Sequence, residues 1–138
     1  MKELNEITIT DISAIIRVVS VKGREEMMIN RKCYGISFCI NGEIVYRHNG
    51  CEITSDRNHA IILPKGGTYE ICGTKTGVFP VINFDCSDDL CDTVTAIPIN
   101  NNESFIHYFE QMENLYLFAQ NRAKIMSVLY DMFHRISQ

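Results

Sequence analysis

The sequence lacks any apolar run of the length that a membrane-spanning helix requires. Such a helix needs about 20 mainly apolar residues in succession, and no segment of this chain of 138 residues comes close. The N-terminal stretch MKELNEITIT also carries two acidic residues before any apolar segment, which is unlike a secretory signal peptide. We therefore expect a cytoplasmic protein that does not contact membranes.

Basic charge is also scarce. The chain has 13 Lys and Arg against 17 Asp and Glu, and its formal net charge is -4. Proteins that bind nucleic acid directly usually present a basic face, because neutralisation of phosphates dominates their affinity. We therefore expect these 138 residues not to bind DNA by themselves.

The cysteines lack the spacing of a metal site. None of the six forms a C-x-x-C pair, and four lie inside apolar segments where a thiol acts as a small hydrophobic group. A redox pair of Cys86 and Cys91 is an alternative, but the acidic residues around them would raise thiol pKa values and weaken reactivity. We expect reduced thiols throughout.

What the sequence does contain is a series of short strand-like segments. Seven of them are rich in β-branched or aromatic residues and are separated by Gly, Asn and Asp turns; they cover residues 15–21, 36–40, 43–48, 51–54, 60–63, 68–72 and 78–84. So many short strands in sequence predict a sandwich or barrel. Asn49-Gly50 predicts a two-residue type I′ hairpin turn. The fold class is therefore mainly β over residues 1–99.

After Asn100 the apolar period changes to 3.6 residues, which predicts two amphipathic helices over residues 100–138. Asn102 and Asn121 are the predicted N-caps. Each apolar stripe must be buried against the barrel, the other helix or another chain. Of these alternatives we favour a homodimer through the C-terminal helices, with contacts from Met112, Leu115, Tyr116, Ile125, Leu129, Met132 and Phe133.

The segment 41–73 has the spacing of the two cupin signatures without their metal ligands. Gly42, His48, Pro64 and Gly66 match, whereas the remaining signature positions hold other residues, among them Gly50, Thr54, Ser55, Asn58, Tyr69 and Gly73. One surviving His cannot form a site that needs three or four converging donors. We expect a cupin-like barrel that binds a ligand, with no metal, no cofactor and no catalytic residues. A metal-dependent enzyme with relocated ligands His48, Glu52 and His59 is the alternative.

The Pro64-Lys65-Gly66 turn, the Arg31-led strand that runs to Phe38 and the helix pair together give a family resemblance. The chain resembles the N-terminal effector-binding domain of AraC-type bacterial transcription regulators. The resemblance implies a small effector such as a sugar in the barrel, a dimer through the helices, and DNA binding by a separate domain that these residues lack. It also suggests that residues 1–12 form an arm over the pocket. A stand-alone binding cupin remains an alternative.

Alternation along the strands predicts which side chains face the barrel interior. The inward set includes Tyr46 and His48 on one strand, and Ile36, Phe38 and Ile40 on another, which leaves Ser37 and Cys39 outward. The predicted ligand-binding residues are Arg31, Phe38, Tyr46, His48, Tyr69 and Phe79. Apolar walls with sparse hydrogen-bonding groups are typical of small-molecule pockets, and the aromatic, hydroxyl and imidazole groups suit a carbohydrate or another neutral polar ligand. Arg31 is expected to pair with a ligand hydroxyl or carboxylate. Tyr46 and Tyr69 as core fillers, Arg31 as a solvated charge and His48 at the rim are the alternatives.

Overall fold

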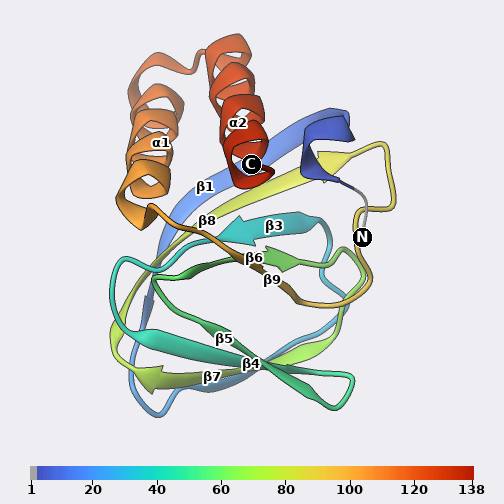
Figure 1. Cartoon of the computed structure of the whole chain (residues 1–138), viewed down its shortest axis with the longest axis vertical. Coiled ribbons are helices and arrows are strands. Elements are labelled where there is room, and N and C mark those ends of the chain that lie inside the picture. The colour runs from blue at the N-terminus through green and yellow to red at the C-terminus, as the bar shows by residue number, and fades with distance from the viewer. Residues whose placement is uncertain (1–2) are drawn as a thin grey trace.

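Two antiparallel β-sheets and a pair of C-terminal helices form three layers (Figure 1). The structure is a computed structural model, and it describes residues 3–138. Helices α1 and α2 cover one sheet, and the second sheet lies on the opposite side of the first. The strands are β1 (Ile9–Ser20), β2 (Glu25–Met28), β3 (Tyr34–Ser37), β4 (Glu43–His48), β5 (Cys51–Ser55), β6 (His59–Leu63), β7 (Tyr69–Lys75), β8 (Gly77–Cys86) and β9 (Thr95–Pro98).

The strand order gives a barrel of two facing sheets. One sheet has the order β1-β8-β3-β6-β9 and the other the order β2-β7-β4-β5. All paired strands are antiparallel, and the chain crosses repeatedly from one sheet to the other. The predicted fold class is therefore confirmed: a mainly β, cupin-like barrel followed by two helices.

All seven predicted strands are present, but two further strands were missed. The segments EEMM of β2 and TAIP of β9 each have four residues and no fully buried side chain. They consequently lack the apolar pattern by which strands are recognised in a sequence. The predicted hairpin turn is confirmed, since Asn49 and Gly50 have φ angles of 52° and 77°.

Asparagine side chains begin both C-terminal helices. The side chain of Asn101 accepts a hydrogen bond from the Ser104 backbone N–H at 3.2 Å and so caps α1 (Asn102–Asn114). The predicted cap, Asn102, is instead the first helical residue, and its buried amide donates to the Cys39 carbonyl at 3.0 Å. Asn121 caps α2 (Arg122–Ile136) as predicted, by accepting from the Lys124 N–H at 3.1 Å.

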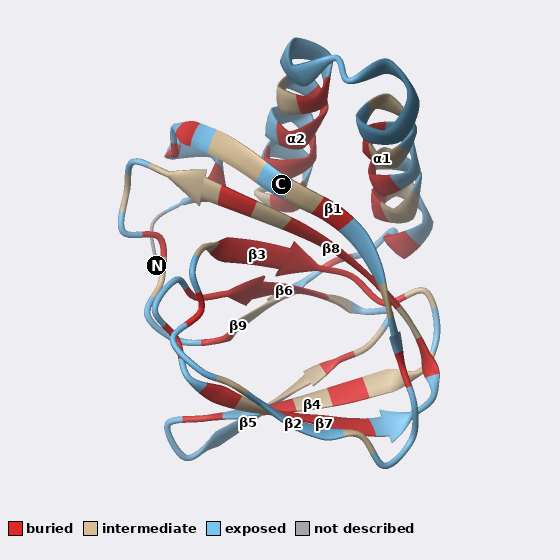
Figure 2. Cartoon of the chain, turned by 180° about the vertical axis from the view of Figure 1, so that it is seen from behind, coloured by how far each residue is buried: buried red, intermediate tan, exposed pale blue. Residues whose placement is uncertain are grey.

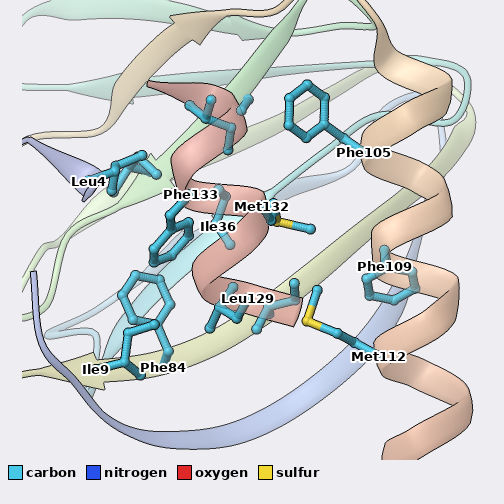
Figure 3. Packing of buried hydrophobic residues seen from close by; sticks show 14 of the residues in the cluster. Leu4, Ile9, Ile36, Phe84, Phe105, Phe109, Met112, Leu129, Met132 and Phe133 are labelled. Carbon is cyan, nitrogen blue, oxygen red and sulfur yellow. The ribbon is translucent and has the colours of Figure 1, made fainter. Parts of the chain in front are cut away.

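The main hydrophobic core lies between the helices and the five-stranded sheet (Figure 3). Phe133 of α2 meets Phe84 of β8 edge to face, with ring centroids 5.3 Å apart. Phe38 stacks on Phe105 of α1 at 5.6 Å. Figure 2 shows β3 buried along its whole length, because it is covered by helices on one side and by the second sheet on the other.

The predicted dimer contacts are largely wrong. Five of the seven residues are at most 4% exposed within this single chain and therefore cannot contact another one: Met112, Ile125, Leu129, Met132 and Phe133. The outer face of the five-stranded sheet is itself apolar, and the helix stripes bury it. Leu115 is half-buried and Tyr116 is exposed, at the C-terminal end of α1.

The predicted arm does not lie over the barrel interior. Leu4 belongs to the short helix η1 (Leu4–Glu6), and with Ile9 it packs beside α2. The Ile9 N–H donates to the Tyr130 hydroxyl at 2.7 Å, and Arg122 pairs with Asp11 at 3.0 Å. Residues 3–12 thus lie against the second helix, and residues 1–2 fall outside the described residues. Across residues 3–138, no helix is long and apolar enough to cross a bilayer.

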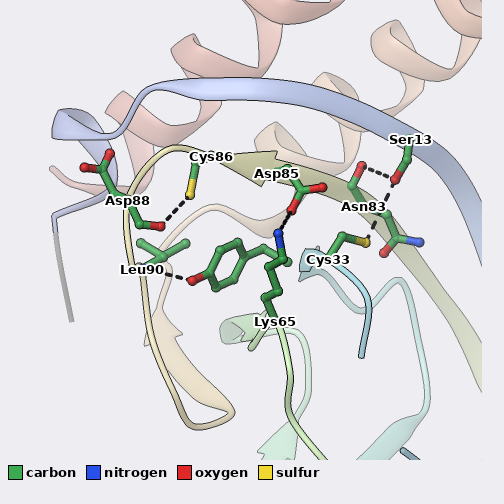
Figure 4. Close-up of polar contacts among 9 residues, drawn as sticks. Ser13, Cys33, Lys65, Asn83, Asp85, Cys86, Asp88 and Leu90 are labelled. Carbon is green, nitrogen blue, oxygen red and sulfur yellow. Dashed lines mark hydrogen bonds and ion pairs between the residues drawn. The ribbon is translucent and has the colours of Figure 1, made fainter. Parts of the chain in front are cut away.

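The cysteines of the proposed redox pair are poorly suited to that chemistry. All six thiols are free. Burial raises the pKa of Cys91 to about 11 and also raises the pKa of Cys86, whose thiol donates to the Asp88 carbonyl at 3.3 Å (Figure 4). Burial is the larger cause, and the nearby acidic side chains add to it. Both groups therefore remain weakly nucleophilic thiols at neutral pH.

Candidate functional site in the barrel cavity

A cavity of about 200 Å³ lies between the two sheets. Its walls come from both sheets and are mainly apolar, with contributions from Ile44, Leu63, Ile71, Phe79 and Val81. Six polar side chains also line it: Arg24, Arg31, Ser37, Tyr46, Tyr69 and Asn83. Its volume is below the range of about 300–1,000 Å³ that is common for drug-sized ligands. The cavity therefore suits a small molecule.

Two tyrosines form one wall of the cavity. Tyr46 of β4 and Tyr69 of β7 are buried, and their rings meet edge to face at 5.7 Å and 71°. Burial raises the pKa of both phenols, although Arg31 acts in the opposite direction on Tyr69. Both hydroxyls are therefore neutral at physiological pH and can donate hydrogen bonds. Strand alternation for Tyr46 and the cupin-signature position for Tyr69 predicted that these side chains face the barrel interior, where the structure has them.

Arg31 is buried in the cavity wall, whereas the commoner position for such an arginine is in solvent. Its side chain donates to the Asn83 side-chain carbonyl, and its Nε lacks a hydrogen-bond partner among the described residues. The guanidinium passes directly over Gly35, where any Cβ would collide with it. Glycine at position 35 thus leaves the room that the arginine occupies.

The turn after β6 holds the backbone of Arg31. The Arg31 N–H donates to the Gly67 carbonyl at 2.9 Å, and the Gly66 N–H donates to the Arg31 carbonyl at 2.6 Å. Lys65 of the same turn pairs with Asp85 of β8 at 3.1 Å (Figure 4). Gly66 adopts φ +79°, which favours glycine. The Pro64-Lys65-Gly66 motif therefore has a local role: it fixes the position of a cavity residue.

Sequence analysis missed three polar residues of the cavity. Arg24 follows the β1–β2 turn, and it forms a bidentate pair with Glu26, with both N–O distances 2.9 Å. Because β2 was not recognised, nothing in the sequence placed Arg24 near the barrel. Ser37 was missed because the two faces of β3 were assigned the wrong way round. Asn83 was missed because it lies among apolar residues of β8.

The prediction that Phe38 faces the cavity is wrong. Phe38 and Ile36 belong to the core beneath the helices, and Ser37 lines the cavity instead. Every residue of β3 is buried, so its two faces are equally hidden from water. Without a polar face, the alternation that reveals the inward side of a half-exposed strand is absent. Phe79, in contrast, does line the cavity and is 1% exposed.

His48 points inward but does not reach the cavity. Its Nδ1 accepts a hydrogen bond from the Val94 N–H at 3.1 Å, which places the proton on Nε2 in the neutral ring. Its ring packs against the edge of Tyr69 at a centroid distance of 5.9 Å. His48 thus joins the segment before β9 to the end of β4. It lines a separate hollow at the surface beside Lys65 and Gly66, and its part in ligand binding stays a prediction.

The alternative metal set is not assembled. Glu52 pairs with Arg47 at 3.0 Å, and His59 meets Asp56 at 2.8 Å, so these two candidates have other partners than His48. Nowhere in residues 3–138 do three His, Cys, Asp or Glu side chains gather in a way that could hold a metal ion.

A larger hollow of about 500 Å³ lies where the helices join. It is lined by Ile12, Tyr116, Leu117, Gln120, Arg122 and Ile125, of which four are exposed to solvent. Its three polar residues, Tyr116, Gln120 and Arg122, are among the exposed ones, so they cost no desolvation when no ligand is bound. We therefore take the barrel cavity, with its buried polar groups, as the candidate site. Its hydroxyls, guanidinium and apolar walls can orient a bound molecule, and they include no activated nucleophile or paired general base.

No protein-family profile matches the sequence, and comparison with curated proteins gives no significant match. Solved structures do share the fold. The AraC-like transcriptional activator CuxR matches with a TM-score of 0.65 at 11% identity, over 90% of this chain and 51% of CuxR. A variant of apo ToxT from Vibrio cholerae matches with a TM-score of 0.62 at 10% identity, over 86% of this chain and 53% of ToxT. This chain therefore spans about half the length of either protein and has the fold of that half.

Proposed function

We propose that this chain is the effector-binding domain of an AraC-type transcription regulator and that it binds a small molecule inside the barrel. The observation that carries the proposal is the cavity, where the partly unpartnered Arg31 and two neutral tyrosine hydroxyls line otherwise apolar walls. Such a combination is typical of small-molecule sites. The fold shared with part of CuxR supports the regulatory context.

Ligand binding transmits a signal only if it favours one arrangement of the surrounding elements. Strand β1 connects the cavity to the helices, since Val18 lines the cavity while Arg17 pairs with Glu113 of α1 at 2.9 Å. The guanidinium of Arg17 also lies over the Phe109 ring, 5.3 Å from its centroid. A shift of β1 on ligand binding would therefore move the point at which α1 docks.

Substitution of Tyr69 by Phe tests the position of the site. The change removes one buried hydroxyl and leaves the ring, so it should weaken ligand binding by about 0.5–1.5 kcal/mol, or roughly 2- to 12-fold. The measurement is isothermal titration calorimetry with ligands found in a thermal-shift screen. Tyr116→Phe, on an exposed tyrosine outside the cavity, is the matched control. Equal affinities for the wild type and Tyr69→Phe would place the site elsewhere.

We also propose that the protein dimerises, through the loop between the helices. Here a short π-helical turn, Leu115–Ala119, presents Leu117 and Phe118 at 58% and 82% exposure beside Tyr116. Apolar side chains gathered at one exposed point favour a contact with another chain. Phe118→Asp should shift the sedimentation coefficient of the protein toward that of a monomer, while circular dichroism shows that the chain stays folded. An unchanged sedimentation coefficient would remove this loop from the interface.

DNA binding would require a part of the protein other than these residues. Reading the gene past the codon for Gln138 tests this directly. A continuation with two helix-turn-helix patterns and a basic surface supports the regulator. A stop codon there would favour the alternative, a binding cupin that acts alone, and it would leave the cavity site unaffected.

A further inference from the structure

The charges around the cavity are unbalanced. Two arginines line it, and none of the other lining residues is an aspartate or glutamate. Glu26, which lies outside the lining, neutralises Arg24 through a bidentate pair. Arg31 takes part in no ion pair with any residue from 3 to 138. One buried positive charge is therefore left without a negative partner.

The guanidinium group of arginine is permanently charged in proteins, so the protein cannot remove this charge. A buried charge without a partner is unfavourable, so a folded protein keeps one only where another interaction compensates for its lost hydration. In this case the neutral oxygen of Asn83 satisfies one arm of the guanidinium, and Nε has no acceptor in the described part of the chain. The side chain is 9% exposed, so bulk water has little access to it. The missing component is an acceptor that carries negative charge.

The neighbouring groups favour the same kind of ligand. The Tyr46 and Tyr69 hydroxyls line the same cavity as Arg31, and Tyr69 lies close enough to interact with the guanidinium. Neutral hydroxyls can donate to a ligand, so Arg31 and the two tyrosines supply several donors to one cavity. A planar carboxylate accepts from several donors at once and forms a bidentate pair with a guanidinium. A neutral sugar carries no negative charge and would leave the charge of Arg31 uncompensated.

The other residues that line the cavity indicate that the rest of the ligand is apolar. Ile44, Leu63, Ile71, Phe79 and Val81 offer no side-chain hydrogen-bonding atoms, and polar groups of a ligand would lose their hydration there. The cavity reaches the surface near β1 and β2, because Ile16 is 44% exposed and Arg24 is half-buried, and both line it. Arg24 lies at this opening with its charge balanced by Glu26, so Arg31 is the unbalanced charge that an entering anion would meet.

We propose that the effector is a small organic acid with one carboxylate and an apolar body, and that its carboxylate pairs with Arg31. The inference rests on the proposed function and specifies its ligand class. It chooses the carboxylate of the two partners expected for Arg31, a ligand hydroxyl or carboxylate, and it replaces the expectation of a carbohydrate because Arg31 is buried without a negative partner.

Matched acids and amides test the class of ligand. Hexanoate and benzoate are titrated into the purified chain by calorimetry, alongside hexanamide and benzamide, which have the same shape without the charge. We expect each acid to bind with an affinity about tenfold or more above that of its amide, since hydrogen bonds to charged groups are the stronger ones. Arg31→Gln should abolish that preference, and Arg31→Lys should restore part of it. Arg47→Gln, on an exposed arginine that pairs with Glu52, should change nothing.

The possible failures can be told apart. If the amides bind as tightly as the acids, or if Arg31→Gln keeps the preference, the acid class is wrong while the cavity remains the site. The acid class is also wrong, and the cavity remains the site, if the acids do not bind but arabinose or glucose binds and Tyr69→Phe weakens that binding. If neither acids, amides nor sugars bind, the inference and the proposed cavity function fail together. Circular dichroism of each variant establishes first that it is folded.

Discussion

Replacement of Leu129 by Asp is expected to leave the chain unfolded. Leu129 is fully buried in the core between α2 and the five-stranded sheet, where it lies with Met132, Phe133 and Met112 (Figure 3). Removing the side chain alone, as in Leu129→Ala, costs about 2–5 kcal/mol in a packed core. An unpaired carboxylate adds several kcal/mol of desolvation. Because small domains are stable by only about 5–15 kcal/mol, the sum removes most or all of the stability.

The measurement is urea denaturation followed by circular dichroism, on the wild type, Leu129→Ala and Leu129→Asp. Ile29→Asp is the control, since Ile29 is an aliphatic residue that is 73% exposed and lies outside the proposed dimer contact. Its free energy of unfolding should stay within about 0.5 kcal/mol of the wild type. A folded, monomeric Leu129→Asp protein would contradict the buried position and would restore the original expectation that Leu129 serves a dimer interface.

Substitution of Gly77 by Ala should also be strongly destabilising, by about 3 kcal/mol. Gly77 begins β8 where the chain passes the loop before β4, and a Cβ at this position would overlap the backbone carbonyl of Asn41. The obstacle is backbone that cannot rotate away. The loop is also fixed by the Asn41 side chain, which accepts from the Val78 N–H at 2.9 Å. Relief of the overlap would therefore separate the two segments and break this hydrogen bond.

Gly50→Ala provides the control for Gly77→Ala. Gly50 has φ +77°, but a Cβ there would meet nothing within 4 Å. The cost is then only that of a non-glycine residue in the left-handed region, about 1–2 kcal/mol. Thermal melts of both variants measure the difference. Equal losses of stability would mean that glycine at position 77 is needed for backbone conformation rather than for close packing.

Local signals predicted the elements of this fold well. The β-branched strand segments, the Asn49-Gly50 hairpin and the Asn121 cap were recognised because each depends on residues close together in the chain. The cupin-like turn of Pro64 and Gly66 was found for the same reason. Tyr46 was placed in the barrel because β4 alternates clearly enough to show an inward side. Tyr69 was placed there because it stands at the position of a cupin-signature histidine.

Other features depended on which layer covers which face. The sequence showed that β3 is apolar and that each helix has an apolar stripe, but not that these surfaces bury one another. Phe38 was therefore assigned to the cavity, and Leu129 to a dimer interface, although both belong to one core. The choice between an intramolecular and an intermolecular partner is made by the whole packing arrangement, because the hydrophobic effect is not directional.

By itself, then, the amino-acid sequence determined the class of fold, seven of the nine strands, the helix pair and the absence of a metal ligand set at the cupin positions. Only the tertiary structure assembled the candidate site. It buried Arg31 over Gly35, brought Arg24 in beside a strand that has no sequence signal, and engaged His48 with a backbone N–H. The physical reason is that burial and charge balance arise from residues far apart in the chain, which no local pattern records.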